Sequence, residues 1–90
     1  MDKIAFADEL FNQLDDLATA EGLQLVDVEI KGQMQRPIVI VYLDKDGGIG
    51  IDVLAAANRW IGAALDDCID SAYTLEVSSP GGRERKKDNG

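Results

Sequence analysis

The sequence predicts an α+β fold, a two-layer sandwich in α-β-β-α-β order with two helices on one face of a three-stranded sheet. Apolar residues recur every three or four positions in two stretches, as in helices, and every second position in two others, as in strands. The 90 residues suffice for one small hydrophobic core. We expect the first two strands to pair antiparallel across a short turn. The third, reached through the second helix, gives a mixed sheet if it runs parallel to a neighbour. The strand order stays open.

Residues 2–21 predict the first helix, with Asp2 as the N-cap and Gly22 as the left-handed residue that ends it. Its apolar side chains form one stripe, which comprises Ile4, Ala7, Leu10, Phe11, Leu14, Leu17 and Ala18. The acidic residues off this stripe are interpreted as a solvated face.

Residues 23–31 predict the first strand, in which apolar and acidic side chains alternate as Val26, Asp27, Val28, Glu29 and Ile30. Pro37 precedes the second strand, residues 38–43, because proline is accepted only at a strand's first position or at a sheet edge. This second strand is apolar on both faces. We therefore expect helices to cover one face and the other to be partly covered.

A turn and a second helix follow. The adjacent glycines Gly47 and Gly48 suit a positive φ, and the helix is predicted over 51–66 with Gly50 as its N-cap. Its predicted buried stripe comprises Ile51, Leu54, Ala55, Asn58, Ile61 and Leu65, with Trp60 at the core edge. The third strand runs from Tyr73 in period-2 alternation, and it stops where Pro80 and Gly81 disfavour a ladder: Tyr73, Thr74, Leu75, Glu76, Val77, Ser78, Ser79, Pro80 and Gly81.

The composition argues against catalysis. The chain has no histidine, which removes the commonest general base and metal ligand. Ser78 and Ser79 have no identifiable base, and the acidic neighbours of Cys68 raise a thiol pKa rather than lower it. The loop that begins with Asp44 resembles the start of a calcium-binding EF-hand but has Ala55 where the bidentate glutamate belongs. We expect no enzymatic activity, no cofactor, no metal and no small-molecule substrate.

Charge and hydropathy indicate the kind of partner. Residues 1–82 carry five basic and fifteen acidic side chains, a balance that repels phosphate backbones and attracts basic proteins. A GxxG sequence of the kind with which KH domains clamp nucleic acids spans residues 47–50, but acidic residues surround it. No apolar run approaches the roughly 20 residues of a membrane span, and no secretory signal opens the chain. One cysteine and no signal favour the cytoplasm.

Three segments together resemble one family. They are residues 22–29 (Gly-Leu-Gln-Leu-Val-Asp-Val-Glu), residues 41–49 (Val-Tyr-Leu-Asp-Lys-Asp-Gly-Gly-Ile) and residues 73–81 (Tyr-Thr-Leu-Glu-Val-Ser-Ser-Pro-Gly). In this order and spacing they resemble the N-terminal domain of the bacterial ribosome maturation factor RimP. The resemblance covers residues 1–81 and leaves residues 82–90 as a charged, flexible tail.

The resemblance implies a non-enzymatic assembly factor that binds the free small ribosomal subunit and helps basic ribosomal proteins to dock, with RNA contacted through the ribosome. Family members continue after Ser-Ser-Pro-Gly into Leu-Asp-Arg-Pro and an SH3-like barrel, whereas here Gly82 and Arg83 follow and the barrel is absent from the sequence. Residues of the matched motifs that reach the surface are the candidate partner contacts: Asp27, Glu29, Asp44, Gly47, Gly48, Ser78, Ser79, Pro80 and Gly81.

Two alternatives remain open. In the first, the tail binds RNA weakly through its cations, which are Arg83, Arg85, Lys86 and Lys87. In the second, the domain pairs with itself or with another chain through an exposed strand edge.

Overall fold

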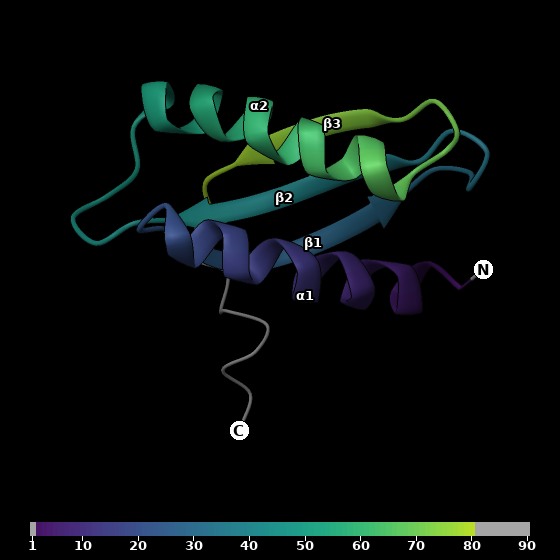
Figure 1. Ribbon diagram of the computed structural model, residues 1–90, viewed down its shortest axis with the longest axis horizontal. Coiled ribbons are helices and arrows are strands. Elements are labelled where there is room, and N and C mark those ends of the chain that lie inside the picture. Colours follow the sequence, from purple (N-terminus) through teal and green to yellow (C-terminus); the bar gives the residue numbers. More distant parts are fainter. Residues whose placement is uncertain (1, 81–90) are drawn as a thin grey trace.

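The helices and strands follow the order that the sequence predicts. The computed structural model describes residues 2–80. It consists of helix α1, strands β1 and β2, helix α2 and strand β3, with the bounds Lys3–Ala20, Gln24–Lys31, Ile38–Asp44, Ile51–Cys68 and Thr74–Ser78 (Figure 1). The α+β fold class predicted from the sequence is confirmed.

Both ends of α1 have the residues that the sequence predicts there. The Asp2 side chain accepts a hydrogen bond from the backbone N–H of Ile4 (3.2 Å), which satisfies one of the free donors of the first turn. Gly22 follows the helix with a φ of 76°, a conformation that residues with a Cβ rarely adopt. At the start of α2, Gly50 is the N-cap, as expected.

The sheet is mixed, with the strand order β1-β2-β3. β1 and β2 pair antiparallel, and their register skips Val26, which forms a β-bulge in β1. β2 and β3 pair parallel, with Ile38 opposite Thr74 at one end and Tyr42 opposite Ser78 at the other. The central strand therefore contributes hydrogen bonds on both sides, and the crossover through α2 connects it to β3.

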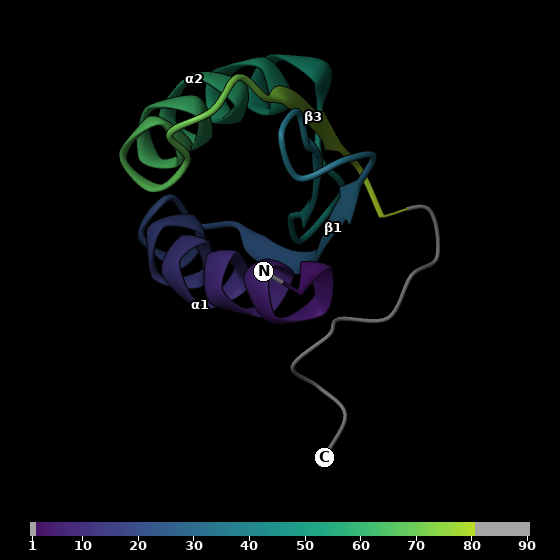
Figure 2. The same cartoon turned by 90° about the vertical axis from the view of Figure 1, so that its right-hand side faces the viewer.

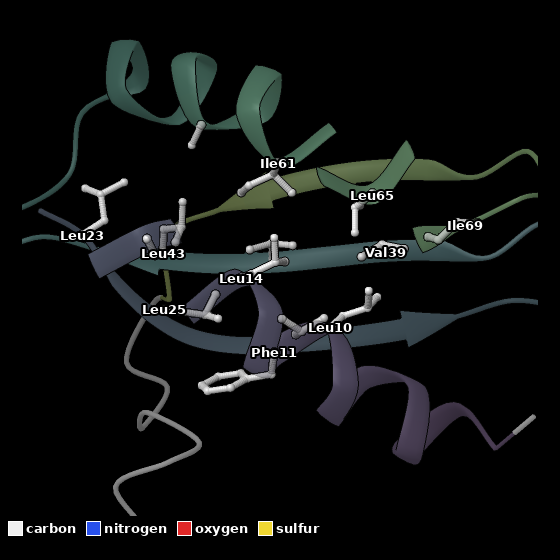
Figure 3. Close-up of a cluster of buried hydrophobic side chains, with 14 of the residues drawn as sticks. Leu10, Phe11, Leu14, Leu23, Leu25, Val39, Leu43, Ile61, Leu65 and Ile69 are labelled. Carbon is white, nitrogen blue, oxygen red and sulfur yellow. The ribbon is translucent and has the colours of Figure 1, made fainter. Parts of the chain in front are cut away.

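Both helices lie on the same face of the curved sheet, with α1 packed on β1 and α2 on β3 (Figure 2). Between helices and sheet lies a cluster of fully or almost fully buried side chains (Figure 3), which includes Leu10, Phe11, Leu14, Leu25, Val39, Val41, Leu43, Ile61 and Leu65. Alternate residues of β2 point into this cluster, so the covered face of the central strand is entirely apolar. Within residues 2–80, neither helix combines the length and the apolar character that crossing a bilayer requires.

The predicted buried stripe of α2 was wrong in its first half. Ile51 is 85% exposed, and Ala55 and Asn58 are also exposed. The residues that α2 does bury are Ala57, Ile61 and Leu65. The small Ala57 takes the inward position predicted for Asn58, because burying an amide without a hydrogen-bond partner costs free energy. The first turn of α2 consequently keeps an apolar surface that its own sheet does not cover.

Candidate functional site

The face of the sheet opposite the helices is the candidate site. Side chains alternate along a strand, so the residues of β2 that do not enter the core point to this second face. They are Ile38, Ile40 and Tyr42, of which Ile38 is 38% exposed and Tyr42 half-buried, whereas Ile40 is only 6% exposed. The expectation that this face is partly covered is confirmed.

Strand pairing arranges this second face in three rows, one residue from each strand. The rows are Lys31–Ile38–Thr74, Glu29–Ile40–Glu76 and Asp27–Tyr42–Ser78. We call these nine residues the acidic sheet face. It carries three carboxylates and one ammonium group, so its net charge is negative. Neighbouring strands are about 4.8 Å apart, which separates the backbones under Glu29 and Glu76 by about 10 Å, with Ile40 between them.

Hydrogen bonds orient two of the carboxylates. The hydroxyl of Tyr42 donates to Oε1 of Glu29 across the strand pair (2.7 Å). Oδ1 of Asp27 accepts a hydrogen bond from the backbone N–H of Val28 (2.8 Å). Both hydrogen bonds come from neutral donors within the sheet.

The three sequence segments that resemble the RimP domain meet at one end of the sheet. β1 starts at this end and β2 and β3 finish there, because β1 is antiparallel and β3 parallel to β2. Asp27, Asp44 and Ser78 therefore lie at the same end of the sheet, although they are far apart in the sequence. The side-chain amide of Gln24 also donates to Oδ1 of Asp46 (3.4 Å), so the loop after β2 contacts the start of β1.

The loop after β2 is a turn that its own residues hold. The N–H of Gly48 donates to the carbonyl of Lys45 (2.9 Å), and Oδ1 of Asp44 accepts from the N–H of Lys45 (2.8 Å). Gly47 and Gly48 have φ angles of 85° and 99°, which explains why two glycines stand here. Within residues 2–80, no group of three or more His, Cys, Asp or Glu side chains is placed to hold a metal ion.

The structure separates the predicted contact residues into two groups. Asp27, Glu29 and Ser78 lie on the acidic sheet face, whereas Asp44, the last residue of β2, leads into the turn that contains Gly47 and Gly48. Beyond β3, Ser79 is exposed and Pro80 half-buried. Gly81 lies outside the described residues, as do the cations predicted to bind RNA, which are Arg83, Arg85, Lys86 and Lys87.

Sequence reasoning missed the neighbours of the predicted acidic residues, namely Ile40, Tyr42 and Glu76. The alternation of the strands already assigned each to a face. What was lacking was the strand order and register, which place Glu76 of β3 in the same row as Glu29 of β1. Two strands distant in the sequence give no local signal of that pairing.

Two titratable groups lie away from this face, near the end of α2. Burial, together with the charges of Asp67 and Glu9, raises the pKa of the Cys68 thiol, which donates a hydrogen bond to Oε1 of Gln13 (2.7 Å). The direction agrees with the sequence-based expectation, although burial is the larger cause. A thiol with a raised pKa is a poor nucleophile at neutral pH. The other group is the hydroxyl of Tyr73, which donates a hydrogen bond to Asp66 (2.7 Å).

Together, these elements form a small α+β domain with one acidic sheet face. A protein-family model described as the RimP N-terminal domain matches residues 13–83, from the middle of α1 to beyond β3. The chain belongs to the RimP N-terminal domain family. The resemblance noted in the sequence is confirmed, and the family associates the chain with ribosome maturation.

Proposed function

We propose that this chain is a non-enzymatic assembly domain that acts in the cytoplasm during maturation of the small ribosomal subunit. It holds a basic ribosomal protein, or the immature subunit through such a protein, on the acidic sheet face. The row Glu29–Ile40–Glu76 carries this proposal, because it places one carboxylate on each side of the central strand. Membership of a family of ribosome maturation factors supports it.

The chemistry of the acidic sheet face fits a protein partner better than a nucleic acid. Carboxylates attract the lysines and arginines of a basic protein and repel phosphates. Tyr42 and Ile38 add an aromatic and an aliphatic surface between the charges, and tyrosine is enriched at protein interfaces. The charges bring the partner in and orient it, and the apolar side chains along β2 lose water when it binds.

Neutralising the three carboxylates with isosteric amides tests the proposal. The variant Asp27→Asn, Glu29→Gln, Glu76→Gln removes three negative charges and keeps the acceptor oxygens that Val28 and Tyr42 use. A matched control, Glu9→Gln, Asp16→Asn, Glu21→Gln, removes three charges from exposed positions of α1 and its C-cap. Binding is measured by co-sedimentation with free small subunits and by anisotropy with their extracted proteins.

We expect the sheet-face variant to bind roughly tenfold more weakly, because each exposed ion pair contributes about 0.2–1 kcal/mol. Its affinity should also depend less steeply on salt. The control should bind like the unmodified chain. Equal loss in both variants would mean that only total charge matters, and no loss in either would exclude the acidic sheet face as the binding surface.

A further inference from the structure

The two edges of the sheet differ in how well they are protected against pairing with another strand. Among residues 2–80, β1 and β3 are the edge strands. β1 carries the bulge at Val26, and bulges are one of the devices by which proteins block edge pairing. β3 pairs with β2 in unbroken register from Thr74 to Ser78 and contains no proline. The β3 edge is thus the better template for a further strand.

The backbone of β3 shows which groups point to that edge. The N–H of Thr74 donates to the carbonyl of Pro37 (3.0 Å), so Thr74 faces β2. Backbone groups of successive residues in a strand point to opposite sides, and therefore the N–H and C=O of Leu75 and Val77 point away from β2. They offer two donors and two acceptors to an added strand.

A groove with a partly apolar lining lies next to the β3 edge. It has a volume of about 540 Å³ and is lined by Ile51, Leu54, Ala55, Asn58, Arg59 and Val77. The α2 residues among them include those that the sequence predicts as buried and that the structure leaves exposed. A fourth strand beside β3 would widen the sheet beneath this side of α2. The added strand would then bury the apolar residues at the start of α2, which the three strands of the domain leave wholly or partly exposed.

Charge selects the partner that fits this edge. On the outer side of β3, Glu76 is exposed and lies in the same row as Glu29, so outward side chains of an added strand would meet negative charge. A second copy of this chain would bring another Glu76 to the same place, where like charges repel. Inward side chains would meet the groove beside Val77, where apolar side chains fit Ile51, Leu54 and Ala55, and where the cation of Arg59 would repel a lysine or arginine.

We propose that the β3 edge binds an extended segment of a basic protein as a fourth strand. In that segment, apolar residues alternate with lysine or arginine, the apolar ones entering the groove and the basic ones lying beside Glu76. This rests on the proposed function in one respect, that the partner is the basic protein attracted to the acidic sheet face. The edge adds backbone hydrogen bonds, which fix the direction and register of the partner.

The test uses the full chain and a synthetic probe. The probe is an amidated ten-residue peptide of alternating lysine and valine. One control peptide has the same composition with all lysines grouped, and another replaces lysine by glutamate. Amide hydrogen exchange at Leu75 and Val77 is followed by NMR, because these two N–H groups point to the β3 edge. We expect the alternating basic peptide to slow their exchange by roughly tenfold or more at saturation, and the controls to leave it unchanged.

A pair of variants at one position separates backbone pairing from side-chain contact. Val77→Pro removes the N–H at the edge, and proline is accepted in edge strands where this group faces outward. Val77→Ala removes only the side chain from the groove. We expect the proline variant to bind the peptide roughly tenfold more weakly than the alanine variant. The exchange measurement on the unmodified chain decides the question if Val77→Pro does not fold.

Three results would overturn the strand-addition proposal. In the first, the peptide shifts the NMR resonances of Glu29 and Tyr42 but leaves amide exchange at Leu75 and Val77 unchanged. That result would confine the partner to the acidic sheet face. Slowed exchange with the grouped peptide would remove the requirement for alternation. Slowed exchange with single-stranded RNA would assign the edge to nucleic acid. Failure of the proposed function has a different signature, unaltered binding to small subunits by the variant with the three amides.

Discussion

The hydroxyl of Tyr73 ties the start of β3 to the end of α2. It donates to Oδ1 of Asp66 (2.7 Å) and lies 3.1 Å from the carbonyl oxygen of Gly62. Burial, the hydrogen bond to Asp66 and the charge of that carboxylate together raise the pKa of Tyr73 to about 12. Because the pKa of this phenol is raised in the folded state, the stability of the domain depends on pH in the alkaline range.

Replacing Tyr73 by Phe should lower the free energy of unfolding at neutral pH by about 1 kcal/mol, because the hydrogen bond is lost. The pKa is higher in the folded state, so the stabilisation by the protonated hydroxyl is complete below pH 10 and is lost as the pH rises through about 12. Raising the pH from 10 to 12 should therefore lower the free energy of unfolding of the unmodified chain more than that of the Phe variant. Urea unfolding at both pH values measures this difference. Tyrosinate absorbance in a Tyr42→Phe background measures the pKa, and a midpoint near 10 would contradict this account.

Substitutions at Gly48 distinguish a role in forming the turn from a role in contacting a partner. A Cβ at Gly48 would meet no atom within 4 Å, but its φ of 99° is strained for alanine. We expect Gly48→Ala to cost about 1–2 kcal/mol, and Gly48→Asn to cost less, because asparagine tolerates a positive φ. Binding of the folded variants to small subunits should be unchanged if the glycines only form the turn. Weakened binding by both would make Gly48 a partner contact.

At the scale of elements, α2 depends on a short buried row. Ile61→Ala should lower the free energy of unfolding by about 2–5 kcal/mol, because Ile61 is fully buried in the core. Ile51→Ala should change it by less than about 0.5 kcal/mol, because Ile51 is 85% exposed. Urea denaturation of both variants measures the difference. Similar costs would mean that the first turn of α2 is buried as the sequence pattern predicts.

Most of the fold could be predicted from the sequence because its signals are local. Asp2, Gly22, Pro37 and Gly50 mark the ends of elements by their own backbone chemistry, and the strands alternate clearly. The rotation of α2 could not be predicted in the same way. An apolar stripe shows that a helix has something to bury, but not whether its own sheet or another chain covers it. Half of the stripe faces the core, and the half beginning at Ile51 faces the groove.

The candidate site was predictable only in part for a related reason. Asp27 and Glu29 were identified from one strand, but their relation to Glu76 follows from the parallel pairing of β3 with β2. The charge imbalance of the chain indicates a basic partner from composition alone, because net charge does not depend on how the chain folds. The place where that charge gathers depends on strand register, which composition does not contain.

For the whole molecule, charge separates the leading proposal from the RNA alternative. Deleting residues 83–90 removes four basic and two acidic side chains and leaves a net charge of −10 on residues 1–82. If the acidic sheet face binds a basic protein, small-subunit proteins should bind this shorter chain at least as tightly. Weak binding to RNA, if the full chain shows it, should disappear with the tail cations. Anisotropy titrations with both probes make the comparison, and loss of protein binding would assign the interface to the tail.

The lengths of the connections between the strands predict the order in which the strands join the sheet. β1 and β2 are joined by the short segment 32–37, whereas β3 reaches β2 only after the whole of α2. Closing the longer loop costs more entropy, and β3 also has no fully buried residue. We therefore expect β3 to dock last during folding and to detach first in the native state. The strand that is best placed to bind a partner is therefore also the one that we expect to open most easily. A bound segment would slow this local opening of β3.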